Sequence, residues 1–147
     1  MKSHTTLELE QAIYRYVRRH AGLFCCFEVT IGWFGSERVD FLTYDTEGTW
    51  RCYEIKSCLA DFRSKHKKTF VGHLNYYVMP SDLYDKVKLE IPRDIGVFCP
   101  GYGLMRKPKR RQLAVEEKVL FASMVRSLYR EAESGIRTKM REAGRAG

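Results

Sequence analysis

The stretch that decides the fold is 38–57, RVDFLTYDTEGTWRCYEIKS. Two runs rich in β-branched and aromatic residues, 38–44 and 49–57, flank the polar tetrapeptide Asp45-Thr46-Glu47-Gly48. Such runs are typical of strands, and Gly48 can adopt the left-handed conformation that a tight turn requires. The pattern therefore predicts a β-hairpin that turns about Glu47.

Two carboxylates meet in this hairpin. In the predicted register Asp40 lies opposite Glu54 with the Cβ atoms about 5 Å apart, while Lys56 points to the same face as Glu54 and lies opposite Arg38. Like charges at opposite positions destabilise a hairpin, so the pair calls for a compensating cation. Oxygen ligands of this kind suit Mg²⁺ or Mn²⁺ rather than zinc, with the carbonyl of Ile55 as a further ligand. Lys56 would then orient or deprotonate an attacking water.

A simpler interpretation stays open, in which these charges form a salt-bridge cluster on an exposed sheet face. The apolar neighbours Phe41 and Ile55 favour a buried site over an exposed one. On a helical wheel of the preceding helix, Glu10 lies closer to the apolar face than Glu8, so Glu10 is the better candidate for a further metal or water ligand. A solvated acidic turn at the start of that helix is the alternative for Glu10.

The remaining sequence predicts helices and strands around the hairpin. We expect a helix over 5–20 capped by Thr5 or Thr6, a strand over 23–34, a basic helix over 59–73, a strand over 75–79, a short helix over 81–88, strands over 95–99 and 102–107, and a helix over 115–133. In the last helix the apolar residues recur at helical spacing, at Phe121, Met124, Val125, Leu128 and Ala132. This order predicts an α/β fold, a mixed central sheet flanked by helices on both faces. We expect one domain over 1–134 and a frayed basic tail over 135–147.

The positive charge is concentrated near the C-terminus. The chain of 147 residues has a net charge of +8, and residues 101–147 hold twelve Lys and Arg against five Asp and Glu. Such an excess favours a polyanionic partner. The densest run, Arg106-Lys107-Pro108-Lys109-Arg110-Arg111, can contact DNA phosphates without reading the base sequence. A solvated loop is the alternative.

Composition excludes several other classes. No apolar stretch is long enough to span a bilayer, and no secretion signal is apparent, so we expect a cytoplasmic protein without a membrane partner. The five cysteines are odd in number and lack zinc-site spacing, so we expect them to be reduced and to pack as small hydrophobes.

A helix and a strand, followed by Val39-Asp40, then Tyr53-Glu54-Ile55-Lys56 and another helix, resemble the PD-(D/E)XK nuclease superfamily. More narrowly, 54–64 (EIKSCLADFRS) and 76–80 (YYVMP) are similar to the MmcB-type family of DNA-repair-related proteins. The similarity covers roughly 39–97, with weaker matching of the flanking helices.

The resemblance implies a restriction-endonuclease-like fold and Mg²⁺-dependent (or Mn²⁺-dependent) hydrolysis of DNA phosphodiester bonds. Asp40 and Glu54 would be metal ligands and Lys56 the catalytic lysine; Val39 replaces the proline of the superfamily pattern without changing a ligand. The family run D-F-R-x-D-x-K appears at 61–67 as DFRSKHK, with lysine in place of the second acid. Its basic residues Arg63 and Lys67 are candidate phosphate contacts.

The sequence thus predicts a metal-dependent DNA endonuclease of DNA-repair or phage and mobile-element type. An intact Asp40, Glu54 and Lys56 favours an active enzyme. The alternative is a catalytically silent DNA-binding accessory protein on the same fold. The preferred DNA structure, any sequence preference and whether the protein acts as a homodimer are left open by the sequence.

Overall fold

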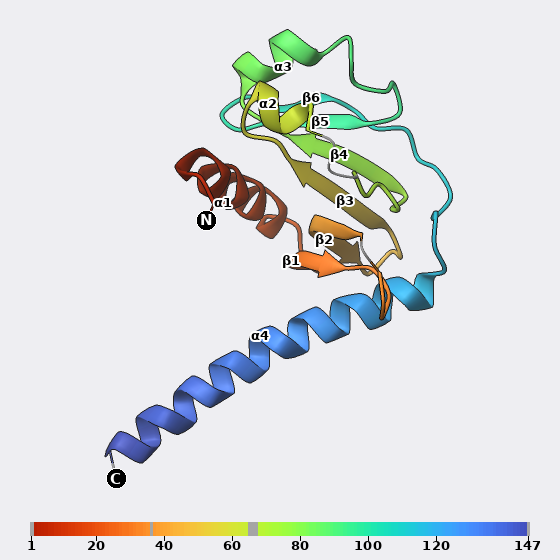
Figure 1. The fold of residues 1–147 in the computed structure, drawn as a ribbon. Helices are drawn as coiled ribbons and strands as arrows, with labels where there is room; N and C mark the ends of the chain where they lie inside the picture. The colour runs from red at the N-terminus through yellow and green to blue at the C-terminus, as the bar shows by residue number, and fades with distance from the viewer. Residues whose placement is uncertain (1, 36, 65–67, 147) are drawn as a thin grey trace.

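The computed structural model describes residues 2–35, 37–64 and 68–146 (Figure 1). Its strands are β1 (Leu23–Thr30), β2 (Arg38–Asp45), β3 (Trp50–Ile55), β4 (Leu74–Val78), β5 (Gly96–Cys99) and β6 (Gly103–Arg106). They form one sheet in the order β1-β2-β3-β4-β5-β6, in which β3, β4 and β5 run parallel and the other neighbours pair antiparallel. This mixed sheet confirms the predicted α/β class.

Helices cover both faces of the sheet, as predicted. They are α1 (His4–Arg18), α2 (Leu59–Phe62), α3 (Ser81–Val87) and α4 (Glu117–Ala146). On one face, α1 packs Ile13 and its apolar neighbours against Phe41 and Tyr53. Because strand side chains alternate between faces, Leu42 and Cys52 point the other way and pack against α4. Towards β4 and β5, α2 and α3 cover the same face as α4.

The predicted hairpin is confirmed in its register. Phe41 lies opposite Tyr53, and Tyr44 lies opposite Trp50. Gly48 has a φ of 88°, and the Asp45 carboxylate accepts the backbone N–H groups of Glu47 and Thr49 in the turn, each at 3.0 Å. An aspartate that bonds its own following backbone is a common turn device, so this turn is set by local sequence.

The helix predicted over 59–73 is much shorter in the structure, because α2 ends at Phe62. The segment that follows it is held along β3 by hydrogen bonds that a helix could not make. The His73 N–H donates to the carbonyl of Trp50 at 2.9 Å, and the Thr69 N–H donates to Oε1 of Glu54 at 3.3 Å. Tertiary bonds of this kind override the helical spacing of the sequence.

Two further boundaries differ from the prediction. The N-cap of α1 is Ser3, whose Oγ accepts the N–H of Thr6 at 3.1 Å, instead of Thr5 or Thr6. The first strand ends at Thr30 instead of residue 34, because the chain turns at Gly32, which has a φ of 80°.

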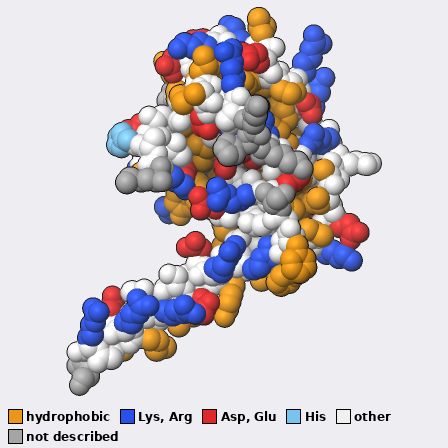
Figure 2. Space-filling view, in the orientation of Figure 1, with side chains coloured by type: hydrophobic (Ala, Val, Ile, Leu, Met, Phe, Trp, Pro, Cys, Tyr) orange, Lys and Arg blue, Asp and Glu red, His pale blue; other side chains and the backbone are white. Residues whose placement is uncertain are grey.

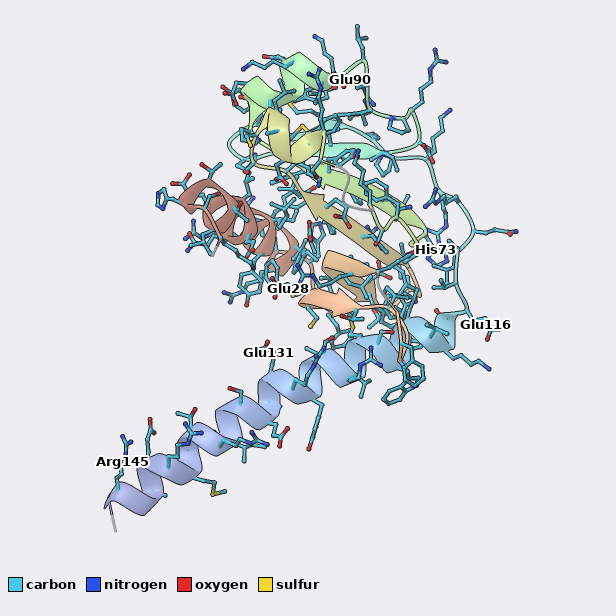
Figure 3. The ribbon with its side chains drawn as sticks, in the orientation of Figure 1. Glu28, His73, Glu90, Glu116, Glu131 and Arg145 are labelled. Carbon is cyan, nitrogen blue, oxygen red and sulfur yellow. The ribbon has the colours of Figure 1, made fainter. Side chains whose placement is uncertain are left out.

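The tail expected to be frayed is helical. α4 continues to Ala146 and projects beyond the sheet, with Arg145 near its far end (Figures 1 and 3). The core face predicted for this helix is only partly correct. Met124 is buried, and the ring of Phe121, although partly exposed, packs edge-on against Tyr44 and Trp50 of the sheet, whereas Val125 and Leu128 are exposed. Leu120, Ser123 and Ser127 complete the buried side of α4. In Figure 2 hydrophobic side chains follow the lower edge of α4 and basic ones lie above them.

The cysteines are free thiols, as expected. Cys26, Cys52 and Cys99 are buried in the core, whereas Cys58 is exposed just before α2 and therefore does not pack as predicted. In the part of the chain that the structure describes, no helix is both long and apolar enough to cross a membrane.

We predict that Gly72→Ala destabilises the protein. A Cβ at this position would stand 2.8 Å from the Trp50 carbonyl oxygen and 3.3 Å from the Cys52 nitrogen, and the β3 backbone cannot move away cheaply. Overpacking of this kind costs ~1–3 kcal/mol, measured as the free energy of unfolding in urea. Gly135→Ala, where a Cβ meets nothing within 4 Å, is the matched control and should not lower that free energy.

Candidate active site

A cavity of about 570 Å³ opens where the first turns of α1, the end of β1, the start of β2 and the end of β3 converge. Its walls are rich in charged side chains. They are Lys2, Glu10, Glu28, Glu37, Arg38, Asp40, Glu54, Lys56 and Asp61. The cavity therefore brings together Asp40, Glu54, Lys56 and Glu10, four of the residues that the sequence singled out, and Ile55 lies in the same wall.

The strands separate at Asp40. The β2–β3 ladder stops at the pair Phe41–Tyr53, and beyond it Oδ2 of Asp40 accepts the N–H of Ile55 at 2.8 Å. A side-chain oxygen thus satisfies a strand N–H in the place of a backbone carbonyl. The backbones of β2 and β3 do not have to stay paired here, so the cavity can open between them.

Glu54 is buried, with 4% of the residue exposed, and its Oε1 accepts the N–H of Thr69 at 3.3 Å. Burial raises its pKa to about 9, and the charge of Asp40 and a hydrogen bond between the two carboxyl groups act in the same direction. Near neutral pH the pair therefore shares one proton, which Glu54 donates to Asp40. Buried carboxyl pairs of this kind are found where a cation or a reacting group later takes the place of that proton.

Lys56 is buried as well, with 6% of the residue exposed. Its Nζ lies 3.9 Å from Oδ1 of Asp61, and Oδ2 of Asp61 accepts the N–H of Ser57 at 2.9 Å. Asp61 is thus fixed by the backbone and orients the lysine. Sequence reasoning did not select Asp61, although its place two residues into a helix that directly follows the Glu-Ile-Lys motif is a usable signal.

Glu10 and Glu8 lie in different surroundings. Lys2 bridges Glu10 at 2.5 Å and Glu28 at 3.0 Å in the cavity wall. Glu8 instead faces His4 on the exposed side of α1. The helical wheel predicted that Glu10 lies closer to the apolar face of the helix than Glu8, which is consistent with these positions.

Glu28 is a second residue that sequence reasoning missed. Its φ of 54° makes it the sole non-glycine residue with positive φ in the described ranges. It lies where the β1–β2 ladder skips a pair, between Phe27–Phe41 and Val29–Val39, directly across from Asp40. Strained backbone at a charged cavity is a feature of functional sites. No sequence signal predicts it, because glutamate has no preference for this conformation.

The metal site predicted from the sequence is only partly assembled. Among the residues that the structure describes, no group of three or more His, Cys, Asp or Glu side chains is arranged to hold a metal ion. The Asp40–Glu54 pair is together, but Glu10 is turned towards Lys2.

Some of the basic side chains predicted to contact phosphate already bond other groups of the protein, and others are exposed to solvent. Arg106 donates to the carbonyl oxygens of Lys88 (2.7 Å) and Ile91 (3.1 Å), which closes the C-terminal end of α3. Arg106 is therefore a structural residue. Arg63 forms a bidentate pair with Glu90, 2.7 Å from NH2 to Oε2, on the surface.

The rest of the basic run is more open. Arg110 donates to Oγ1 of Thr49 at 3.1 Å, and one guanidinium nitrogen of Arg111 lies 3.5 Å from Asp94. Lys107 and Lys109 are exposed. Lys67 lies outside the described residues.

The basic run and the carboxylate pair lie at opposite ends of the central parallel strands. The Arg111 N–H donates to the carbonyl of His73, just before β4, and the Lys109 N–H donates to that of Asp94, just before β5. Lys56 directly follows the end of β3, which runs parallel to β4. The two regions are therefore separated by a strand length, roughly 17–20 Å. In Figure 3, His73, next to the basic run, accordingly lies to the right of the sheet, and Glu28, in the wall of the cavity with the carboxyl pair, lies to the left.

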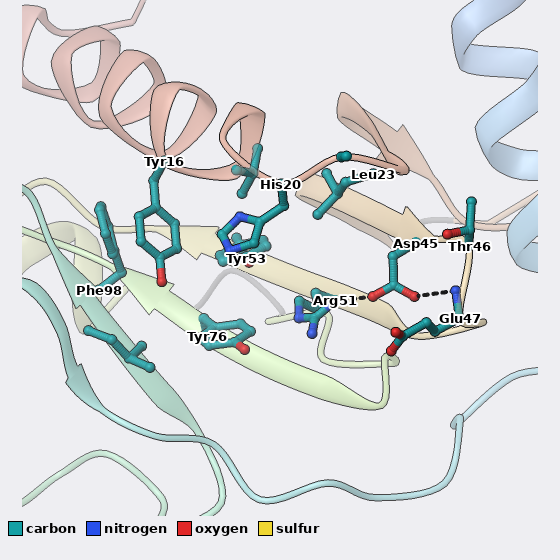
Figure 4. Close-up of a pocket in the computed structure, with 13 residues that line it drawn as sticks. Tyr16, His20, Leu23, Asp45, Thr46, Glu47, Arg51, Tyr53, Tyr76 and Phe98 are labelled. Atoms are coloured by element: carbon teal, nitrogen blue, oxygen red, sulfur yellow. Dashed lines mark hydrogen bonds and ion pairs between the residues drawn. The ribbon is translucent and has the colours of Figure 1, made fainter.

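A second cavity, of about 350 Å³, lies beside the C-terminal end of α1 (Figure 4). Tyr53 and Tyr76 stack in its wall with ring centroids 4.6 Å apart, next to Arg51. The charge of Arg51 is already neutralised by Asp45 at 2.7 Å. This cavity contains none of the residues that the sequence predicted.

We predict that the stability of the protein falls as pH rises from about 4.3 to about 9. The unfolded carboxyl of Glu54 titrates near 4.3, but its folded pKa is about 9. The native state therefore binds the additional proton in this window, and stability is lost as pH rises through it. Glu54→Gln, which keeps the hydrogen bonds without the titration, should flatten urea-unfolding free energies across this range. Glu8→Gln should leave the slope unchanged; an unchanged slope in Glu54→Gln would contradict the assignment.

Comparison with known proteins supports the fold alone. No family model matches the chain, and no curated protein matches it. A solved structure described as the SPO1766 protein of unknown function from Silicibacter pomeroyi is similar over 95% of this chain and 96% of its own, with a TM-score of 0.73 and 17% sequence identity. At this identity the similarity concerns the arrangement of helices and strands and assigns no family or function.

Proposed function

We propose that the protein is a metal-dependent DNA endonuclease that hydrolyses phosphodiester bonds. The observation that carries the proposal is the pair of carboxyl groups of half-buried Asp40 and buried Glu54, which line an open cavity together with buried Lys56. Two acids that share a proton next to a buried lysine are expensive to maintain, and structure alone does not require them.

Asp40 and Glu54 supply two of the oxygen ligands that a divalent cation needs. Asp40 and Glu54 offer hard oxygen ligands, which Mg²⁺ and Mn²⁺ prefer, and Mg²⁺ usually completes its shell with waters and substrate phosphate oxygens. A bound divalent ion would polarise the phosphoryl group and lower the pKa of a water. The raised pKa of Glu54 means that this pair must release its proton to offer two charged ligands.

Lys56 supplies positive charge at the same place. Asp61 holds its ammonium group at the cavity wall, so that Lys56 is positioned next to the carboxyl pair instead of extending into solvent. There it would stabilise charge on the phosphoryl oxygens, or take part in proton transfer with the attacking water.

A DNA partner is supported by the charge distribution. Lys107 and Lys109 are exposed in the loop before α4, and further arginines follow on α4 itself. Such side chains attract a phosphate backbone without reading its sequence.

A second candidate, a catalytically silent DNA-binding accessory protein, is favoured by one observation. Glu10 is bridged to Glu28 by Lys2, and no third metal-ligating side chain joins Asp40 and Glu54 among the described residues. With two carboxylates, an ion would depend more on its waters and on the substrate than in a three-ligand site.

We predict that Asp40→Ala, Glu54→Ala and Lys56→Ala each reduce Mg²⁺-dependent cleavage by about 100-fold or more, the size of effect expected when a ligand or a proton-transfer group is removed. The measurement is cleavage of a panel of labelled duplex, flap, junction and single-stranded DNAs with Mg²⁺, Mn²⁺ or EDTA. Lys118→Ala, in the exposed sequence Glu116-Glu117-Lys118, is the matched control and should cleave like wild type.

Binding without cleavage by the wild-type protein would favour the silent accessory protein. Metal-dependent cleavage that survives all three substitutions would show that the active site lies elsewhere.

Glu10→Ala should reduce cleavage more than Glu8→Ala. Glu10 lines the cavity, whereas Glu8 faces His4 on the exposed side of α1. The comparison uses single-turnover rates at saturating protein. Equal rates in the two variants would exclude a role for Glu10.

Replacing Lys107 and Lys109 by Gln should weaken DNA binding about equally for all sequences. Each lost phosphate contact reduces the slope of log affinity against log salt by about 0.9 on duplex DNA. Cleavage of fully bound DNA should persist, since both lysines lie at the end of the parallel strands opposite to Lys56. Arg106→Gln, the control for structural disruption, should instead lower the melting temperature. A collapse of single-turnover cleavage with unchanged affinity would contradict the docking role.

A further inference from the structure

The loop between β1 and β2 presents two aromatic rings to solvent. Trp33 is 74% exposed and Phe34 is fully exposed, and they lie between Gly32 and Gly35. The other tryptophan of the chain, Trp50, is completely buried. Two adjacent large rings in water are unfavourable for an isolated domain, so this loop is a candidate binding surface.

The base of the loop is held firmly by hydrogen bonds, although its rings are exposed. The Gly32 N–H donates to Oγ of Ser123 at 3.0 Å, and the Arg126 guanidinium donates to the carbonyls of Thr30 (2.9 Å) and Gly32 (2.7 Å). The Ile31 N–H donates to the carbonyl of Glu37 at 3.0 Å, which closes the loop. The rings are thus displayed from a backbone that α4 anchors, and little ordering would be lost on binding.

Positive charge begins at Trp33 and continues along α4. The Arg126 guanidinium carbon lies 4.9 Å from the centre of the Trp33 ring. Arg130, Arg137 and Arg141 follow Arg126 at spacings that place all four on one side of α4. Aromatic rings beside a row of arginines match a ligand with flat bases and a charged backbone.

The loop is also continuous with the candidate active site. Gly35 and Arg38 line the cavity that contains Asp40 and Glu54. A chain whose bases lie on Trp33 and Phe34 would therefore have its backbone directed along the α4 arginines or towards the carboxyl pair.

We propose that Trp33 and Phe34 are a stacking platform for unpaired nucleic-acid bases, so that the protein binds single-stranded DNA or the single-stranded part of a branched DNA. Bases within a duplex already stack on each other and offer no free face, whereas unpaired bases stack on aromatic side chains whatever their identity. The proposal rests on the proposed nuclease function only for what happens to the bound strand in the cavity.

The test uses the intrinsic fluorescence of the full chain in EDTA, where no metal-dependent cleavage can occur. A short oligo(dT) should quench the tryptophan emission of the wild-type protein, and Trp33→Phe should abolish the quenching, because the remaining Trp50 is buried. Trp33→Ala and Phe34→Ala should each weaken oligo(dT) binding by about tenfold or more. Affinity for a duplex should change less than twofold. Tyr102→Ala, an exposed aromatic in the turn between β5 and β6 at the other edge of the sheet, is the matched control.

The proposal is overturned if Trp33→Ala binds oligo(dT) like wild type, or if vesicles containing phosphatidylglycerol alter the Trp33 emission and oligo(dT) does not. Its failure can be told apart from failure of the nuclease. Metal-dependent cleavage by the wild-type protein, together with unchanged oligo(dT) binding in Trp33→Ala, would support the nuclease and exclude the platform. Loss of oligo(dT) binding in Trp33→Ala, with no cleavage by any form of the protein, would support the stacking platform and exclude the nuclease function.

Discussion

The hydrogen bond from the Ile55 N–H to the Asp40 carboxylate is the interaction on which the rest of the site depends. It satisfies a strand N–H that would otherwise need a carbonyl of β2, so the two strands can separate after Phe41 and Tyr53. The same bond holds Asp40 beside Glu54. Across β2, the strained backbone of Glu28 lies where the β1–β2 ladder skips a pair. One side-chain bond therefore couples the end of the hairpin, the opening of the cavity and the proximity of the acids.

Groups around Glu54 partly offset the cost of burying its charge. Glu54 loses water, and its pKa rises because burial and Asp40 both oppose its charge. The Thr69 N–H and Lys56 act in the opposite direction, and Asp61 in turn holds Lys56. The segment 68–73 reaches β3, where the Thr69 N–H bonds Glu54 and the His73 N–H bonds the carbonyl of Trp50. A helix continued through this segment would not offer these N–H groups to β3.

The sheet separates three surfaces of different character. The carboxyl pair lies at the C-terminal end of β3, and the basic run passes the N-terminal ends of β4 and β5. α4 packs against β1 and anchors the aromatic β1–β2 loop through Ser123 and Arg126. The basic residues of the chain consequently have two roles: Arg106 and Arg126 donate to backbone carbonyls, while the exposed Lys107 and Lys109 remain available to a polyanion.

The sequence by itself determined the hairpin, its register and the α/β order, because Asp45 and Gly48 form the turn locally and the alternation of residues in β2 and β3 admits one register. It also predicted that Asp40, Glu54 and Lys56 lie together, and all three line one cavity, although β2 and β3 separate before Asp40 and a side-chain bond holds it there. Only the tertiary structure decided the length of α2, the position of Asp61 and the conformation of Glu28, which depend on bonds between distant segments. The course of α4 was decided there too. Its periodic apolar residues predicted a core face that includes Val125 and Leu128, but these are exposed, and the buried side of the helix carries Leu120, Ser123 and Ser127 instead. Hydrogen bonds of Ser123 and Arg126 to the β1–β2 loop fix the helix in this orientation.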